Sequence, residues 1–319
     1  MRYYDLSLTK TGSTVPYLRW TSHPKGIYDP GALNVEFDAV VYPYNTPFGA
    51  TTITVHGVSL QNLTSAQDLT GMQVTLKGGM AAGLPLANPK QAGVLIVAEV
   101  FQSFGNWEGT DMTLDLVVVP STYSYEHPGN IVLNWVAGQS LSTALQQCLQ
   151  VAYPQYPIVL NLSANLVSDQ THTGRYATLE GLAQWVSQFT RRKLLNEVSI
   201  TIQAGKIQIF DSLYNPAPIA IDFADMVGQP TWIEPNIMQV KTVMRADVMV
   251  GSMIQMPKGL VSAPGFILTA ANALPSSLKY RSSFSGKFFV KELRQIGNFR
   301  TPDGASWVTL MNCAMVQNG

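Results

Sequence analysis

The sequence predicts a mainly β protein with an α+β insertion, and three observations support this fold class. Runs in which apolar and polar residues alternate fill most of the first 120 residues and return in the last quarter. Gly, Pro, Asn and Asp separate these runs, as is typical of turns between antiparallel strands. Helical spacing is confined to the middle of the chain. We therefore expect a β unit over residues 1–125, an α+β unit over 126–230 and a second β unit over 231–319.

The first third contains six predicted strands. They are Tyr4–Leu8, Leu33–Val40, Ile53–Val58, Met72–Leu76, Val94–Phe101 and Met112–Val119. The last two have continuous apolar stretches, which is typical of central strands. Because an open edge this apolar would aggregate, we expect a closed or nearly closed β structure. The small residues and prolines of Gly78–Pro89 predict a surface loop, either a contact loop or a plain connector.

The middle of the chain predicts two helices and a hairpin. Ser140 is a suitable N-cap for a helix that Pro154 stops, and a second helix begins at Thr178. The apolar stripes of these helices are Leu141, Ala144, Leu145, Cys148 and Leu149, then Leu179, Leu182, Ala183, Val186 and Phe189. Arg191–Lys193 lie at the C-terminal end of the second predicted helix, where positive charges interact favourably with the helix dipole. This local role explains the basic triplet without nucleic-acid binding. The hairpin follows as Val198–Ile202 and Ile207–Asp211. Composition changes at Ser121–Asn130, which marks the boundary before these elements.

The last quarter returns to strands. After Met238–Met244, we expect a strand in Val248–Pro257 and a long loop over Pro257–Pro275. Phe288, Val290 and Leu293 then alternate with polar neighbours, and Trp307–Met311 is a further short apolar run. Thr301–Gly304 supplies the turn between these last two strands.

Composition favours a protein that assembles. The chain is 46% hydrophobic but only 13% charged, against roughly a quarter charged in average proteins. Obligate interfaces are depleted of Lys, Glu and Asp, so large subunit contacts explain this better than a Ser/Thr-rich free surface. The net charge of zero provides no field that would recruit nucleic acid or an anionic membrane. Cys148 and Cys313 match no metal or disulfide spacing, which predicts core thiols and assembly in a reducing cytoplasm.

The chain carries no strong catalytic motif. Gly138–Ser142 begins like a nucleophile elbow but ends in Ser where Gly is required, and Ser140 is better explained as a cap. Gly286-Lys287 lacks the upstream Gly of a phosphate loop, and Phe288 replaces the magnesium-binding hydroxyl.

Isolated titratable residues add little to this picture. The four histidines, His23, His56, His127 and His172, lack a second ligand at metal-site spacing. Glu99 and Glu108 with Asp111 are the candidates for a glycosidase carboxylate pair, yet they resemble ordinary strand-edge acids. We therefore expect no enzyme, and no catalytic, cofactor-binding or metal-binding residues.

Several motifs together resemble the central baseplate hub proteins of contractile-tailed, myovirus-type bacteriophages. These are the Val250-Gly251-Ser252 run ending in Pro257, Gly286-x-Phe288-x-Val290, Gly297-x-Phe299-Arg300, Ser306-Trp307-Val308-Thr309 and Tyr176-x-Thr178-Leu179-x-x-Leu182-x-x-Trp185. The order of units resembles this family over essentially the whole chain. The N-terminal third matches only in strand content.

The resemblance implies a structural protein. Such hubs are trimers with two tail-tube-like β-barrels per chain, and the resulting pseudo-sixfold ring joins the hexameric tail tube to the trimeric central spike around a channel for the genome. It implies a homotrimer in the virion tail baseplate, assembled in the host cytoplasm, with the tube, spike, tape measure and baseplate wedge proteins as partners. DNA would be present only in transit, and stable membrane insertion is not expected. The alternative is a β-rich adhesion or binding module, or, less favoured, a cell-wall hydrolase of the tail tip.

Overall fold

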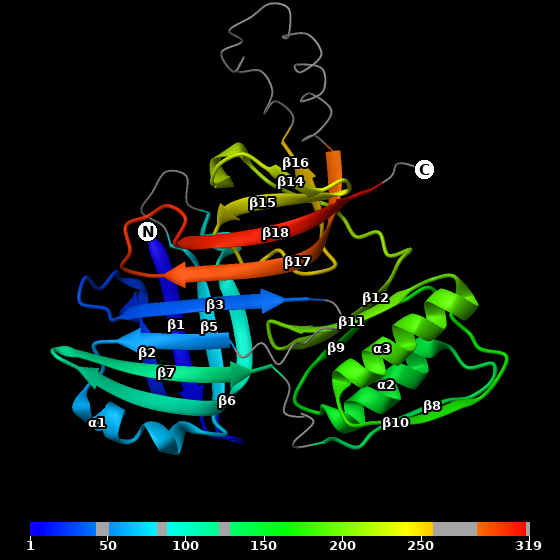
Figure 1. Cartoon of the computed structure of the whole chain (residues 1–319), viewed down its shortest axis with the longest axis horizontal. Helices are drawn as coiled ribbons and strands as arrows, with labels where there is room; N and C mark the ends of the chain where they lie inside the picture. The colour runs from blue at the N-terminus through cyan, green and yellow to red at the C-terminus, as the bar shows by residue number, and fades with distance from the viewer. Residues whose placement is uncertain (43–50, 82–87, 121–127, 258–285, 317–319) are drawn as a thin grey trace, which may run out of the picture.

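The computed structural model describes residues 1–42, 51–81, 88–120, 128–257 and 286–316, and it is mainly β, as predicted. Figure 1 shows a β-rich body and, beside it, a smaller unit that carries the two long helices. The longest sheet contains thirteen strands, and eleven of them follow in the order β14-β15-β18-β17-β3-β4-β7-β6-β5-β1-β2. Strands of both predicted β units therefore belong to one sheet.

The N-terminal part supplies seven strands. They are β1 (Arg2–Thr9), β2 (Pro16–Thr21), β3 (Asn34–Val41), β4 (Thr51–His56), β5 (Gln73–Met80), β6 (Gly93–Glu108) and β7 (Asp111–Val119), with α1 (Leu60–Thr64) and the short helices η1 (Pro24–Gly26), η2 (Ala66–Leu69) and η3 (Pro89–Gln91). All six predicted strands are confirmed, although Gly57 and Val58 lie beyond β4. Strand β2 was not predicted; it is a short edge strand whose Leu18 and Trp20 are only half-buried against the N-terminal core and alternate with Arg19 and Thr21.

The predicted loop Gly78–Pro89 needs a correction at its start. Gly78 and Gly79 continue β5, where they pair with Tyr4 and Tyr3 of β1. A Cβ on Gly79 would lie 2.5 Å from Cα of Ala92, so the sequence needs glycine there for close packing rather than for a loop. Residues 82–87 of this segment lie outside the described residues.

The middle of the chain forms the two helices at the predicted places. The α+β elements are β8 (Ile131–Trp135), α2 (Leu141–Ala152), β9 (Ile158–Asn161), β10 (His172–Tyr176), α3 (Leu179–Phe189), the π-helical turn η4 (Thr190–Leu194), β11 (Val198–Gln203) and β12 (Lys206–Asp211). The Ser140 hydroxyl accepts a hydrogen bond from the Thr143 N–H, and the Thr178 hydroxyl accepts one from the Gly181 N–H. The predicted N-cap Ser140 is thus confirmed, and the second helix begins directly after the predicted start, Thr178, which is its cap.

The predicted hairpin is also present, with β9 added in parallel to β12. Ala204 and Gly205 join β11 to β12 with φ angles of 48° and 73°. Two consecutive left-handed residues give the tight turn whose twist suits a two-residue hairpin. The predicted boundary at Ser121–Asn130 lies largely outside the described residues, which resume at Pro128.

The C-terminal part supplies the remaining strands. They are β13 (Ile219–Ala220), β14 (Thr231–Glu234), β15 (Ile237–Val243), β16 (Met253–Met256), β17 (Gly286–Asn298) and β18 (Trp307–Met315), with η5 (Phe223–Asp225) after β13. The strands predicted around Phe288 and Trp307 are confirmed. In the predicted strand Val248–Pro257, only Met253–Met256 is extended, because Gly251 turns the chain with φ of 90°. Residues 258–285, which include most of the predicted long loop, lie outside the described residues.

Three hydrophobic clusters lie beneath these elements. The first packs the N-terminal strands around Leu6, Val55 and Leu116, and it also receives Trp307 from β18. The second fills the α+β unit, and the third packs β15–β18 around Val240 and Met311. In the described residues the strand order ends at β14 and β2 rather than closing into a ring.

Candidate interaction surfaces

Strand β17 joins the two β parts by changing its partner along its length. Its first residues, Gly286–Phe289, pair with β16, whereas Leu293–Asn298 pair with β3 of the N-terminal part. Its other edge pairs with β18 throughout, and the register shifts between Val290 and Glu292, close to the change of partner. One strand therefore serves as an edge of both β parts and removes the free edge that each would otherwise have there.

The outward face of this joined sheet carries a ladder of polar side chains. The inward positions of β3 and β17, such as Phe37 and Val290, are buried, so the residues between them point to the opposite face. Cross-strand bonds on the outward face run Gln239–Asn312 (3.1 Å), Asn312–Glu292 (2.6 Å), Arg294–Asp38 (2.7 Å), Asn298–Glu36 (3.0 Å), Thr54–Asp115 (2.6 Å) and Asn106–Asp115 (2.7 Å). We call this surface the polar face.

The polar face is suited to solvent rather than to a tight protein contact. The side chains of Arg294 and Asp38 are both 46% exposed, and exposed ion pairs contribute only about 0–1 kcal/mol to stability. The bonds satisfy the polar groups from within the chain. The network has four carboxylates, those of Glu36, Asp38, Asp115 and Glu292, against one guanidinium. Its charge is therefore predominantly negative.

The α+β unit contacts both β parts through the turn of its hairpin. The Gln203 side chain donates to the Val250 carbonyl at 2.9 Å and accepts from the Val250 N–H at 2.8 Å. On the other side a Cβ on Gly205 would lie 2.9 Å from Val97 of β6, so glycine allows the turn to approach that strand. The Thr201 hydroxyl donates to the Tyr42 carbonyl. These contacts fix where the unit lies against the sheet.

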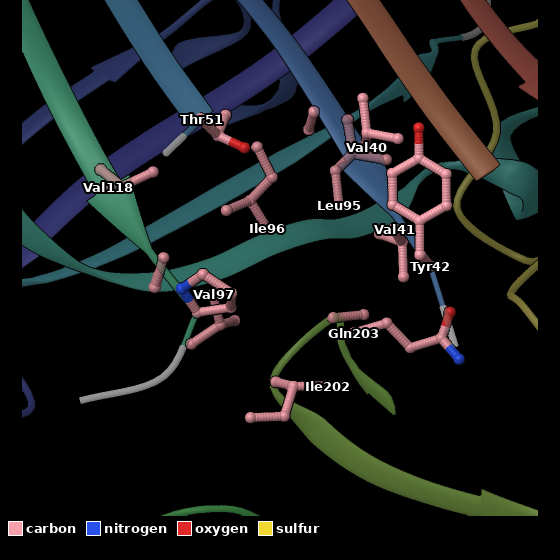
Figure 2. A pocket seen from close by; sticks show the side chains of 14 residues that line it. Val40, Val41, Tyr42, Thr51, Leu95, Ile96, Val97, Val118, Ile202 and Gln203 are labelled. Carbon is pink, nitrogen blue, oxygen red and sulfur yellow. The ribbon is translucent and has the colours of Figure 1, made fainter. Parts of the chain in front are cut away.

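A small apolar pocket of about 50 Å³ lies where the hairpin meets the sheet. Figure 2 shows Val40, Val41, Ile96 and Val97 of the sheet on one side and Ile202 with Gln203 on the other. Among the described residues that line it there is no cluster of ionisable groups, so the pocket resembles a packing gap between units more than a catalytic site.

A buried ionic network ties the β5–β6 connection to the C-terminal part. Arg245 is 1% exposed, and its guanidinium donates to Asp225 at 3.2 Å and to Asp247 at 2.7 Å. The Gln91 side-chain N–H donates to the same Asp225 oxygen at 2.8 Å, while the side-chain Oε1 of Gln91 is buried without a partner among the described residues. Paired buried charges fix a geometry more than they add stability.

The candidate catalytic carboxylates do not converge. Glu99 and Glu108 both lie on β6, nine residues apart, which corresponds to about 30 Å of extended strand. Glycosidase carboxylates lie about 5–9.5 Å apart. Asp111 pairs with Glu108 at the exposed β6–β7 turn and is far from Glu99. Gly286-Lys287 begins β17, as expected for a strand rather than a phosphate loop.

The histidines are dispersed, and no group of metal-binding side chains occurs in the described part of the chain. His23 contacts Tyr3 and Tyr28, and burial lowers its pKa. His56 lies 3.6 Å from Glu36 and 3.8 Å from Asp111. The His172 ring packs on the Phe189 ring, and its Nε2 forms a hydrogen bond with the Ser168 hydroxyl at 3.0 Å. His127 lies outside the described residues.

The two cysteines are buried and free, which confirms them as core thiols. Burial raises the pKa of Cys148 to about 11 and raises the pKa of Cys313 further. Arg191–Lys193 lie in η4 at the end of α3, as predicted, and all three are exposed.

Sequence reasoning did not identify the polar face, Gln203 or Arg245 as important. Each depends on partners far away in sequence: Val250 is 47 residues from Gln203, and Asp38 is 256 residues from Arg294. The one available signal was Arg245 itself, a charged residue between the apolar stretches of Met238–Met244 and Val248–Val250.

Comparisons with known proteins support the tail-protein resemblance at the level of fold. No protein-family model matches the chain, and no curated protein matches its sequence. None of the helices in the described ranges is long and apolar enough to span a membrane. Solved structures, however, match nearly the whole chain.

Three examples have TM-scores between 0.50 and 0.54. A tail protein from Neisseria meningitidis MC58 has a TM-score of 0.54 at 9% identity, with 98% of this chain and 96% of that chain covered. The E. coli c3393 protein, described as a type VI secretion component similar in structure to the T4 tail proteins gp27 and gp5, scores 0.52 at 7% identity, covering 98% and 77%. The 43 kDa tail protein of prophage MuSo2 from Shewanella oneidensis scores 0.50 at 7% identity, covering 98% of each chain. The chain therefore has the fold of phage tail proteins, in agreement with its sequence resemblance to baseplate hubs.

Proposed function

We propose that the chain is a structural baseplate hub protein. Three copies form a ring that joins the hexameric tail tube to the trimeric central spike, and the genome passes through the central channel. In this proposal residues 1–125 and 231–319 are the two tube-like barrels of each chain, and residues 126–230 are the α+β domain. The fold shared with phage tail proteins supports a structural role in the tail.

The junction between β17 and β3 is the observation that carries the proposal. A threefold ring can match a sixfold tube when each chain presents two similar units side by side, held in a fixed relation. Leu293–Asn298 of β17 provide that relation through backbone pairing with β3. The third hydrophobic cluster is distinct from the first, as two barrels in one chain require.

The polar face is our candidate for the channel wall. It extends across both β parts, and its side chains bond to one another. DNA binding depends mainly on Lys and Arg contacts to phosphate, which release counterions. A wall with more carboxylates than guanidinium groups therefore lets DNA pass without holding it.

The native mass tests the ring directly. We expect the purified chain to be a trimer with three times the 34.8 kDa mass of one copy, and we expect averaged electron micrographs to show a ring with a central opening. Co-purification with a spike or tube protein from the same tail is the second measurement. A stable monomer at tens of micromolar that binds neither partner would contradict the hub function and favour the binding-module alternative.

A further inference from the structure

The β6–β7 turn carries exposed aromatic side chains beside acidic ones. Phe104 and Trp107 of β6 are 44% and 61% exposed, and Glu108 and Asp111 flank the turn. Residues 101–119 contain three acids and no Lys or Arg. We call Phe104, Trp107, Glu108 and Asp111 the acidic end. Phe104 pairs with Asp115 and lies on the same side of the hairpin as Glu108 and Asp111, whereas Trp107 lies on the opposite side. Exposed aromatic side chains therefore border the acids on both sides of the turn, and Trp is enriched in protein contacts.

A complementary surface surrounds η4 in the α+β unit. Arg191, Arg192 and Lys193 are exposed and form no ion pair within the described residues. Leu195 follows them and is 88% exposed, and Leu213 is 64% exposed. A hydrogen bond from the Ser212 N–H to the Glu197 carbonyl brings the Leu213 segment beside Leu195. We call Arg191, Arg192, Lys193, Leu195 and Leu213 the basic end.

Leu195 is an unusual residue for its backbone conformation. Its φ of 52° places it in the left-handed region, where a side chain with a Cβ is disfavoured and glycine is common at a helix end. The exposed leucine side chain gains no burial within its own chain. Strained, exposed residues of this kind persist where a contact uses them. This points to a partner that covers Leu195.

The two surfaces lie at opposite ends of the molecule. The β11–β12 turn contacts the sheet through Gly205, so the other end of β11, where Val198 follows Leu195, points away from the sheet. Figure 1 shows the β6–β7 turn at the left end of the long axis and the α+β unit at the right end. The two ends of one copy therefore cannot meet each other.

We propose that the acidic end of one copy binds the basic end of the next copy, in a head-to-tail contact. This inference rests on the proposed trimeric ring and identifies the contact that closes it. Opposite charges, exposed apolar side chains on both surfaces and their separation in one molecule all favour a second copy as the occupant. A contact between different surfaces of identical chains closes into a ring when the rotation allows it. Arginine against Trp107 adds a cation–π interaction to the ion pairs.

Charge reversal tests the contact. One variant carries Glu108→Lys and Asp111→Lys, a second carries Arg191→Glu and Arg192→Glu, and a third carries all four substitutions. We expect each two-site variant to associate at least about a hundredfold more weakly than the original chain, because like charges then face each other. The four-site variant restores opposite charges and is expected to regain the trimer. The readout is native mass across a dilution series, at low and at physiological salt.

Leu195→Gly separates an interface role from a folding role. Glycine fits the left-handed conformation, so this variant is expected to unfold at the same temperature as the original chain, or a higher one, when both are diluted to monomers. The same variant is expected to form the trimer more weakly because the covered leucine is lost. Val151→Ser is the control, because Val151 is 84% exposed on α2 and lies outside both the acidic end and the basic end. This variant is expected to change neither the unfolding temperature nor the strength of trimer formation.

The outcomes distinguish this inference from the hub function. If the original chain is a monomer, both the head-to-tail contact and the hub function are contradicted. A trimer that persists unchanged in both two-site variants and in Leu195→Gly would overturn the head-to-tail contact and leave the hub function standing. Failure of the four-site variant to regain the trimer, with its fold intact by circular dichroism, would likewise overturn the pairing of these two ends.

Discussion

The side-chain amide of Gln203 and the backbone of Val250 form two reciprocal hydrogen bonds, of 2.9 and 2.8 Å, in a buried position. Through them a single residue imitates a strand partner and connects the α+β unit to the C-terminal β part. Gln203 also donates to Gln208 across the hairpin at 2.9 Å, which fixes the orientation of its amide.

Gln203→Ala is expected to destabilise the chain by about 2–4 kcal/mol, because the buried N–H and C=O of Val250 both lose their partner. Urea unfolding followed by fluorescence measures the change. Gln208→Ala is the matched control on the neighbouring strand; it removes one half-buried partner and is expected to cost no more than about 1 kcal/mol. Equal losses in the two variants would contradict the special position of Gln203.

Trp307→Ala is expected to cost about 3–5 kcal/mol and to impair assembly. Trp307 is 3% exposed, packs against Phe37 and Phe299, and donates to the Gly79 carbonyl at 2.9 Å. Trp307→Phe keeps most of the packing and loses the hydrogen bond, so its cost is expected to be about 1–3 kcal/mol. Thermal unfolding and native mass provide the measurements. Normal stability and normal trimer formation in the alanine variant would show that this packing is dispensable.

Arg245→Met is expected to cost about 3–5 kcal/mol, because it leaves the buried carboxylate of Asp225 without its cation. Arg294→Met is the control; it breaks an exposed pair with Asp38 and is expected to cost less than about 1 kcal/mol. Chemical denaturation of both variants gives the comparison. A large loss in the control, or none in Arg245→Met, would reverse this ranking.

The two thiols are expected to be unreactive in the folded chain. With a pKa of about 11, Cys148 is only about 0.1% thiolate at pH 8, and Cys313 is buried with a raised pKa. A disulfide reagent should therefore modify the thiols only after denaturation. The same shifts make the chain less stable as the pH rises above about 9, because the thiols of the unfolded chain lose protons there and those of the folded chain do not. Rapid labelling of the native chain would contradict this account.

The polar face gives a prediction about DNA. Glu36→Gln with Asp38→Asn removes two negative charges per chain and leaves Arg294 without its anionic partner. If this face lines the channel, the ring of the double variant is expected to retain DNA with an affinity that falls as salt rises, whereas the original ring does not. A gel-shift titration across salt concentrations measures this. If the original ring and the double-variant ring bind DNA equally, the polar face does not line the channel.

Local pattern predicted the elements of this chain far better than their relations. The strands around Leu6, Val55 and Val290 alternate cleanly because one face of each is buried, so their period was visible. The helix caps at Ser140 and Thr178 were equally local. Strand β2 was missed because its alternation is limited to Leu18 and Trp20, which are only half-buried at the edge of the sheet. Val248–Ser252 was overpredicted because its apolar residues pack without being extended.

The polar face could not be predicted because its residues resemble ordinary surface until the strands are in order. Glu36 and Asn298 are neighbours only because β17 lies beside β3. The same holds for Gln203, which looked like a turn residue until its amide met Val250. The candidate surfaces follow from long-range pairing, which periodicity within a segment does not contain.

The pairing of β17 with β3 has a mechanical consequence. Six residue pairs, from Leu293 and Val41 to Asn298 and Glu36, connect the two β parts along a common axis. A force that slides one part past the other along that axis loads these backbone hydrogen bonds together, in shear, whereas a force that peels the strands apart breaks them one after another. The joint is therefore stiffest along the strand direction, and a thrust aligned with it passes through the chain without opening the seam.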